Sequence, residues 1–330
     1  MKTLAAALSL LLACADPASA YLKFGLTTSG GTAPVKWSGT VRYFITQGTS
    51  VPGVSAADFQ AAIARAFATW EAVPTSSIRY ESGGPTSARP LEDDGRSTLG
   101  FLDKPEFDRT LASTSILVDD VTGEIVESDI FFNSIFPWSV AGAGESNRFD
   151  LESIAVHEIG HMSGLGHSAL AETELVDGRR RVTAAETVMF PIAYLPGNID
   201  DRTLKADDVA GISDVYPDGG FQANLGSLSG HATLDGRGLF GAHVMAFNPA
   251  TQKIVAGFTL DQAGTFSLAA LDPGVYVVRV EPLDDADIGS FFGLDMYPVE
   301  LDFRVTFADR LVVVPKGGDS GAVDVSVVRK

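Results

Sequence analysis

The chain has 330 residues, 45% of them hydrophobic, and a formal net charge of −18 at pH 7. This length is sufficient for two domains, each with a core of its own. The acidic balance excludes nucleic acid as an expected partner, because its phosphates would be repelled. No apolar run after the N-terminal segment is long enough to span a membrane.

The first residues are typical of a secretory signal peptide, which we place at residues 1–20. Lys2 provides the positive start, Leu4 to Ala13 form a short apolar core, and Ala18-Ser19-Ala20 is a small-residue cleavage site. A short buried helix is the alternative, but Asp16-Pro17 would interrupt it. We therefore expect a secreted, extracellular protein.

Cys14 is the only cysteine, so the exported chain would contain no disulfide, which favours a bacterial protein. The run Leu11-Leu12-Ala13-Cys14 also resembles a bacterial lipobox, in which a lipid is attached to the cysteine. Two locations therefore stay open: free secretion, or a lipid anchor at Cys14 that holds the protein at the cell envelope.

The next predicted elements are a strand and an amphipathic helix. Alternation around residues 41–45 predicts the strand. Ser55 to Asp58 form a capping box that opens the helix, and Pro74 ends it. Aromatic and aliphatic residues recur at helical spacing, so we expect them to pack in the core against a sheet. They are Phe59, Ile63, Phe67 and Trp70.

Residues 81–98 are rich in Gly, Ser, Asp and Pro, which predicts a loop. Two strands follow, Ser113 to Val118 and Ile125 to Phe132, joined by a turn at Asp120 to Gly123. Acidic residues cluster in this segment. Their negative charge either serves solubility alone or binds a structural calcium ion. They are Asp119, Asp120, Glu124, Glu127 and Asp129.

The following helix, with Asp150 as its expected N-cap, carries a metal-binding motif. His157 and His161 lie one turn apart on the same face. Gly164 allows a sharp turn that returns His167 as a third ligand. Three protein ligands with an open fourth position are typical of catalytic zinc. Chance alone would place three His and one Gly at these offsets in roughly one of ten thousand such chains.

Glu158 directly follows the first histidine and can reach a water on the metal, so we interpret it as the general base of hydrolysis. Met189 would form a soft apolar floor beneath the imidazoles, or be an ordinary core methionine. A helix near residues 204–215 is expected to close this domain, and residues 216–220 are a boundary signal.

After this boundary, residues 226–283 contain short strands separated by turns. This spacing predicts an all-β sandwich, to which residues 299–328 would add two or three strands. His231 and His243 belong to this part, and neither has a companion ligand at a suitable spacing. We therefore expect both to be ordinary strand or turn residues.

The motif HExxHxxGxxH from His157 to His167 resembles the signature of metzincin metalloproteases. The segment Thr187 to Pro191 resembles their methionine turn around Met189. Ser168 directly after the third histidine, and Pro191 two residues after the methionine, resemble the matrixin branch, the family of the matrix metalloproteinases.

The resemblance covers roughly residues 21–217, with further similarity in residues 123–133 and 204–212. It implies an α+β metzincin catalytic domain, in which a twisted mixed sheet packs with a zinc helix. We further expect the strand Ile125 to Asn133 to be an exposed edge that pairs with an extended peptide. Phe190 to Tyr194 would form the outer wall of the pocket beyond the scissile bond.

Three features depart from the matrixins. The pro-segment with its zinc-blocking cysteine is absent, as are the extra histidines that hold the structural zinc of animal matrixins. The gap from His167 to Met189 is longer than usual and contains Arg179 to Arg181. We therefore expect neither a cysteine-switched zymogen nor a second, structural zinc.

Residues 264–268 and 271–276 resemble the prealbumin-like domain of the carboxypeptidase regulatory type. The expected plan has four parts: a signal peptide at 1–20, a matrixin-like domain at 21–217, a linker at 218–225 and a β-sandwich at 226–330.

The predicted function is that of a secreted zinc endopeptidase that acts as a monomer on protein or peptide substrates. An alternative is a surface adhesion or binding protein with an accessory protease-like domain, and the intact set of three histidines and Glu158 argues against it. A third possibility is self-processing, in which the β-domain is removed after export.

Overall fold

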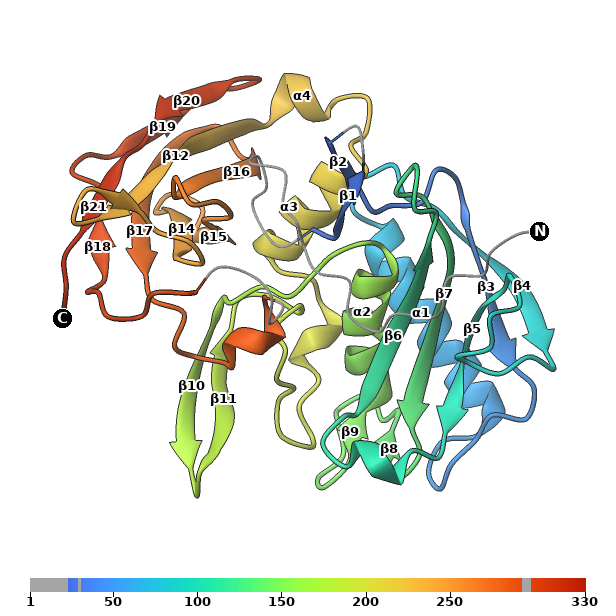
Figure 1. Cartoon of the computed structure of the whole chain (residues 1–330). Helices are drawn as coiled ribbons and strands as arrows, with labels where there is room; N and C mark the ends of the chain where they lie inside the picture. The colour runs from blue at the N-terminus through green and yellow to red at the C-terminus, as the bar shows by residue number, and fades with distance from the viewer. Residues whose placement is uncertain (1–22, 29–30, 293–297) are drawn as a thin grey trace.

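The structure is a computed structural model that describes residues 23–28, 31–292 and 298–330. The predicted signal peptide at residues 1–20 and the candidate anchor Cys14 lie outside these residues. Figure 1 shows two parts: a sheet with helices, formed by the described residues up to 225 and called the first part, and a region of strands in the last third of the chain. We call residues 226–330 the C-terminal β-region.

The first part is built on a five-stranded sheet with the order β4-β3-β5-β7-β6. β6 runs antiparallel to β7, and the other neighbours are parallel. The strands are β3 (Val41–Thr46), β4 (Tyr80–Thr86), β5 (Ser97–Leu102), β6 (Ala112–Val118) and β7 (Ile125–Asn133). This is a mixed sheet, as the family resemblance implies.

Two expectations about this sheet are wrong. The strand Ile125–Asn133 was expected at the edge, but β7 lies between β5 and β6, so β6 is the edge strand. Residues 81–98 were expected to form a loop, yet they contain most of β4 and the start of β5. Gly83 lies in β4. A Cβ at this position would lie 2.3 Å from the ring of Phe44, so packing requires the glycine that had suggested a loop.

Helix α1 (Ala56–Glu71) packs against this sheet (Figure 1). Ser55 caps it as predicted, because its Oγ accepts a hydrogen bond from the backbone N–H of Asp58 at 3.2 Å. The indole Nε1 of Trp70 donates to the carbonyl of Val156 at 2.8 Å and ties α1 to the next helix. The predicted stripe is fully buried, with Phe59, Ile63, Phe67 and Trp70 all 0–2% exposed.

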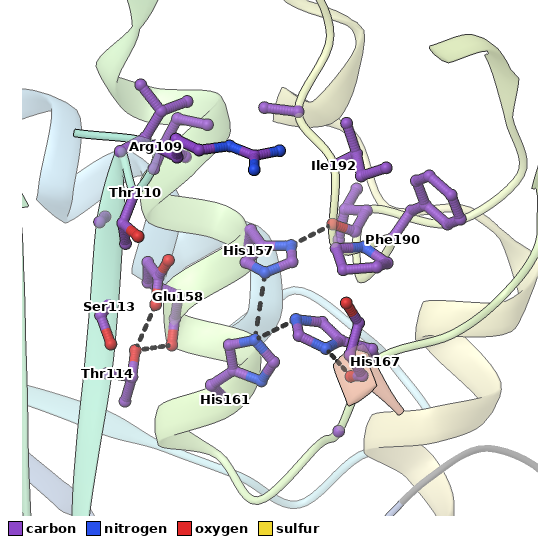
Figure 2. Close-up of a pocket in the computed structure, with 18 of the residues that line it drawn as sticks. Arg109, Thr110, Ser113, Thr114, His157, Glu158, His161, His167, Phe190 and Ile192 are labelled. Carbon is purple, nitrogen blue, oxygen red and sulfur yellow. Dashed lines mark hydrogen bonds between the residues drawn. The ribbon is translucent and has the colours of Figure 1, made fainter. Parts of the chain in front are cut away.

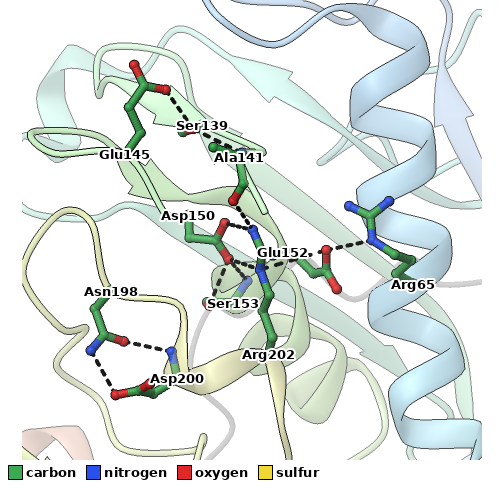
Figure 3. Close-up of polar contacts among 10 residues, drawn as sticks. All are labelled: Arg65, Ser139, Ala141, Glu145, Asp150, Glu152, Ser153, Asn198, Asp200 and Arg202. Carbon is green, nitrogen blue, oxygen red and sulfur yellow. Dashed lines mark hydrogen bonds and ion pairs between the residues drawn. The ribbon is translucent and has the colours of Figure 1, made fainter. Parts of the chain in front are cut away.

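Helix α2 (Leu151–Met162) begins after Asp150, whose carboxylate accepts from the N–H of Ser153 at 2.8 Å. The guanidinium of Arg202 donates to both oxygens of the same carboxylate, at 2.9 and 2.5 Å (Figure 3). Glu152 accepts from Arg65 of α1 at 2.7 Å. Because a buried carboxylate without a partner is costly, this network fixes where α2 begins.

A hairpin that the sequence analysis did not predict fills the long gap between His167 and Met189. It consists of β10 (Ala171–Val176) and β11 (Arg179–Ala185). Its turn residues Asp177 and Gly178 have φ of 51° and 75°, as a two-residue Asp-Gly hairpin requires. The closing helix is present as expected, as α3 (Ala206–Val215).

The remaining elements of this part are short. The predicted linker at 218–225 contains the helix α4. Within the described ranges, no helix combines the length and the apolar character needed to cross a bilayer. The short elements are β1 (Gly25–Thr28), β2 (Gly31–Pro34), η1 (Pro105–Phe107), β8 (Trp138–Ser139), β9 (Phe149–Asp150), η2 (Asp200–Arg202) and α4 (Phe221–Asn224).

The C-terminal β-region contains two five-stranded sheets. In one sheet β12 (Gly226–Leu234) pairs with every other strand; these are β13 (Arg237–Gly238), β16 (Thr265–Leu271), β20 (Asp319–Ala322) and β21 (Val325–Val327). The other sheet comprises β14 (His243–Asn248), β15 (Lys253–Phe258), β17 (Gly274–Glu281), β18 (Thr306–Phe307) and β19 (Val312–Val314). Residues 299–328 thus hold four short strands, against the two or three expected.

The two parts of the molecule share buried contacts. Asp207 of α3 accepts from the backbone N–H of Ala256 in β15 at 2.8 Å. A hydrophobic cluster joins Phe190 of the first part with Phe258 and Phe291 of the C-terminal β-region. The connection β17–β18, which includes η3 (Ile288–Ser290), crosses to the first part and reaches the predicted site.

Candidate metal centre

Helix α2 and the turn after it bring the three predicted histidines together. His157 and His161 lie one turn apart on α2, and Gly164, which follows the C-cap Ser163, has φ of +91°. That glycine is required, because a Cβ on Gly164 would lie 2.5 Å from the carbonyl oxygen of Val35. The chain therefore turns sharply, and His167 comes back to face the other two rings (Figure 2).

The three Nε2 atoms converge on one point. His161 Nε2 lies 3.1 Å from Nε2 of His157 and 3.1 Å from Nε2 of His167. In an ideal tetrahedral zinc site with bonds of about 2.05 Å, two ligand nitrogens would lie about 3.3 Å apart. Within the described part of the chain, no other group of three or more His, Cys, Asp or Glu side chains converges in this way.

Each imidazole is oriented by a backbone carbonyl at its other nitrogen. His157 Nδ1 lies 2.7 Å from the oxygen of Val188, and His161 Nδ1 lies 2.8 Å from that of Leu165. His167 Nδ1 lies 2.6 Å from the oxygen of Ser290. Because a carbonyl only accepts, each Nδ1 carries the proton and each Nε2 presents a bare lone pair to the others.

Burial keeps these imidazoles neutral. It lowers the pKa of His157 to about 3, with the nearby His167 as a further cause. The pKa values of His161 and His167 are also lowered, chiefly by burial. Three neutral imidazoles with converging lone pairs cannot hydrogen-bond one another, whereas they fit the ligand set of a zinc ion. The residues present thus fit the metal.

Glu158 lies beside this centre, between α2 and the edge strand β6 (Figure 2). The hydroxyl of Thr114 in β6 lies 2.6 Å from Glu158 Oε2. Burial raises the pKa of Glu158 to about 7, although the bond from Thr114 opposes this shift. A carboxyl group with such a pKa can both accept and release a proton near neutral pH.

The turn at Met189 packs beneath the histidines. A Cβ on Gly160 would lie 2.3 Å from Met189 Sδ, so the bare glycine makes room for the methionine under α2. Asp208 fixes the turn: it accepts from the hydroxyl of Thr187 at 2.6 Å and from the N–H of Val188 at 3.0 Å. This places the Val188 carbonyl against His157.

Asp207, next to Asp208 on α3, holds the segment after His167. Its carboxylate accepts from the hydroxyl of Ser168 at 2.6 Å, in addition to the N–H of Ala256. Both aspartates lie within residues 204–212, where the sequence resembles the matrixins, and no role was expected for either. No local sequence pattern predicts these hydrogen bonds, because the carboxyl groups on α3 bind segments that are far away in the chain.

A cleft of about 1070 Å³ opens over the three histidines and Glu158. The wall expected from Phe190 to Tyr194 is there, and all five of these residues line the cleft. The edge strand β6 contributes Thr114, in place of the predicted strand Ile125–Asn133. Two walls were not predicted: the hairpin with Arg179 and Arg180, and residues 287 and 289–292 of the C-terminal β-region.

Two residues of the predicted acidic cluster accept hydrogen bonds from nearby turns and loops. Asp129 accepts from the N–H groups of Thr98 and Leu91 at 2.7 and 2.6 Å, and burial raises its pKa to about 7. Asp119 accepts from Thr122 within its own turn. These contacts organise loops beside β7, and calcium stays a prediction.

Comparisons with known proteins agree with this geometry. A protein-family model described as Matrixin matches residues 36–217. Over 183 residues the chain is 29% identical to Matrix metalloproteinase-20 of Homo sapiens, which covers 55% of the chain and 32% of that relative. Over 154 residues it is 28% identical to Metalloendoproteinase 2-MMP of Arabidopsis thaliana, which covers 42% of the chain and 37% of that relative. The chain thus spans about a third of the length of these relatives.

Proposed function

This chain belongs to the matrixin family, and from that premise we propose that it is a zinc-dependent endopeptidase. The family is one of metalloendopeptidases that use zinc. The observation that carries the proposal is the convergence of three bare Nε2 atoms in an open cleft. We assign His157, His161 and His167 as zinc ligands, Glu158 as the general base and Met189 as the floor beneath the imidazoles.

Zinc, when bound there, supplies a Lewis acid that polarises a water molecule and the scissile carbonyl. Glu158 takes the proton of the attacking water and passes it to the leaving amine. Thr114 holds one carboxylate oxygen at 2.6 Å, and among the described residues no other side chain donates to Glu158. The carboxylate is thereby held in place without a cation that would weaken it as a base.

The cleft suggests how a peptide is held. The outer edge of β6 has backbone N–H and C=O groups that no neighbouring strand of this sheet pairs. We propose that an extended peptide pairs along this edge, opposite the wall formed by Phe190 to Tyr194. The scissile carbonyl would then lie between Glu158 and the three histidines.

We further propose the cellular setting and the domain plan expected above. Residues 1–20 would direct export, with a lipid anchor at Cys14 as the alternative outcome. Residues 21–217 would be the catalytic domain and 226–330 a β-sandwich of the prealbumin-like type. The buried contacts between the two parts support a chain that stays intact, against the self-processing alternative.

The test is a peptide-library digestion by the purified protein, with and without a chelator, read by mass spectrometry. We expect cleavage that the chelator abolishes and zinc restores. Glu158→Gln should lower kcat by about 10²–10⁴-fold with zinc still bound, because the variant loses the base and keeps the ligands. Glu81→Gln is the matched control, since Glu81 is exposed on β4, the opposite edge of the sheet.

Two outcomes would contradict the proposal. Full activity of Glu158→Gln would rule out Glu158 as the base. Chelator-resistant cleavage, or a purified protein that takes up no zinc, would rule out the metal mechanism.

A further inference from the structure

The third proposed ligand differs from the other two in what holds it. The carbonyl acceptors for His157 and His161 belong to Val188 and Leu165, inside the segment that matches the matrixin family. The acceptor for His167 is Ser290, 123 residues further along the chain and in the C-terminal β-region. Among the described residues, no other acceptor contacts His167 Nδ1.

The segment that carries this carbonyl is well anchored. We call residues 287–292, between β17 and β18, the cleft loop. The N–H of Ser290 donates to the carbonyl of Asp287 at 2.9 Å within the short helix η3. Phe291 and Phe292 are 7% and 3% exposed, and their rings lie 5.5 and 5.3 Å from that of Phe258 in β15. The Ser290 carbonyl is therefore held by a buried aromatic cluster and not by a free surface loop.

The cleft loop also touches the ligand and the substrate wall directly. The ring of Phe291 lies 6.3 Å from that of His167, edge to face at 77°. Phe291 and Phe292 share one buried cluster with Phe190, the first residue of the wall. The loop does not close the site, because all three histidines and Glu158 still line the cleft.

We propose that the cleft loop is part of the active site, with Ser290 as the positioning residue for the zinc ligand His167. The Ser290 carbonyl fixes the tautomer and the orientation of the His167 ring, and Phe291 keeps that carbonyl in place. Removal of such an outer partner of a zinc ligand typically weakens metal binding by 10- to 100-fold. The C-terminal β-region is then required for a complete metal site, and its loss would leave His167 without its acceptor.

This inference rests on the proposed function, in that the three histidines bind zinc. The test uses the full-length protein and measures zinc affinity by competition with a chromophoric chelator. A backbone carbonyl cannot be deleted by substitution, so Phe291→Ala removes its anchor instead. We expect zinc affinity to fall by about 10- to 100-fold. Phe307→Ala is the control, because Phe307 lies in β18 of the same region and is 56% exposed.

A second variant covers the case in which Phe291→Ala does not fold. Ser290→Gly removes no side-chain contact that the structure shows and only loosens the backbone, so zinc affinity should fall by roughly two- to fivefold. The visible spectrum of the Co²⁺-loaded protein should shift in both variants, since the geometry of one ligand changes. A merely structural role would lower the melting temperature of the metal-free protein without moving that spectrum.

The outcomes separate the two proposals. If the wild type binds zinc and His167→Ala weakens it, the metal site stands. Unchanged zinc affinity and an unchanged Co²⁺ spectrum in folded Phe291→Ala or Ser290→Gly would then overturn the role of the cleft loop alone. If His167→Ala binds zinc as tightly as the wild type, the proposed metal site itself fails.

Discussion

The two parts of this molecule contribute to the cleft in opposite ways. The segment that matches the matrixin family contains the three histidines, Glu158 and the turn at Met189, all within a short stretch of chain. Among its described residues the C-terminal β-region has no comparable group of His, Cys, Asp or Glu side chains, yet its backbone carbonyl at Ser290 lies 2.6 Å from His167 Nδ1. The family match ends at residue 217, but residues beyond it also line the cleft.

The histidines and Glu158 lie in one part of the molecule, whereas the groups that orient them come from both parts. The side chains that we propose to react lie close together in the sequence, where helical spacing places them. The carbonyls and apolar rings that orient these side chains depend on the tertiary fold. The carbonyl of Ser290 and the ring of Phe291 belong to the C-terminal β-region. Three predictions test this division, beginning with the largest effect.

The sharpest contrast is between the half-buried His161 of the first part and the buried His243 of the C-terminal β-region. His161→Ala should abolish zinc uptake and lower peptide hydrolysis roughly a thousandfold or more, because the metal supplies several kcal/mol of transition-state stabilisation. His243→Ala should keep its zinc and lose about 1–3 kcal/mol of stability, since His243 is 2% exposed and its Nδ1 lies 3.0 Å from Glu281 Oε1. Zinc content per chain and urea unfolding measure both. Loss of zinc in His243→Ala would break the comparison.

The second prediction concerns Asp207, which accepts hydrogen bonds from Ser168 of the first part and from Ala256 of the C-terminal β-region. Burial and the neighbouring Asp208 raise its pKa to about 8. The folded state therefore holds a proton that the unfolded chain releases above about pH 4. Asp207 thus makes the protein less stable as the pH rises from about 4 to about 8, by at most about 1.4 kcal/mol per pH unit.

Asp207→Asn keeps a neutral side chain at all pH values, so its unfolding free energy should fall less steeply with pH than that of the wild type. Urea unfolding of the metal-free protein at pH 5, 6, 7 and 8 measures this slope. Burial also raises the pKa of Asp208 to about 6 and the pKa values of Asp129, Glu158 and Asp201 to about 7, so these groups contribute to the slope that remains. Equal slopes in variant and wild type would show that Asp207 is ionised in the folded protein.

The smallest expected effect is at the hairpin. The N–H of Thr173 in β10 donates to Asp285 Oδ1 at 2.9 Å and so ties the hairpin to the C-terminal β-region. Asp285→Ala removes this acceptor, which is worth about 1 kcal/mol, and should speed hydrogen exchange of the Thr173 amide about fivefold. Asp284→Ala is the control, because only the backbone carbonyl of Asp284 bonds the hairpin, through Arg180. Exchange that rises equally in both variants would mean that the Asp285 carboxylate is not the tie.

Prediction from sequence succeeded where the signal is local. The cap at Ser55, the buried stripe of α1 and the start of α2 after Asp150 follow from spacing within one helix. The hairpin was missed although Asp177-Gly178 between two runs is a recognised hairpin signal. The edge strand was assigned wrongly because strand order depends on which strands pair, and β6 and β7 are both compatible with an edge in sequence.

By itself, the sequence determined the converging side chains: His157, His161 and His167 with Glu158 beside them. It could do so because residues four apart share a helix face and a glycine permits the sharp turn. Only the tertiary structure decided that β6 is the edge and that Val188, Leu165 and Ser290 supply the three acceptors. Every residue has a backbone carbonyl, so no residue type marks the one that will meet a histidine; the fold alone selects it.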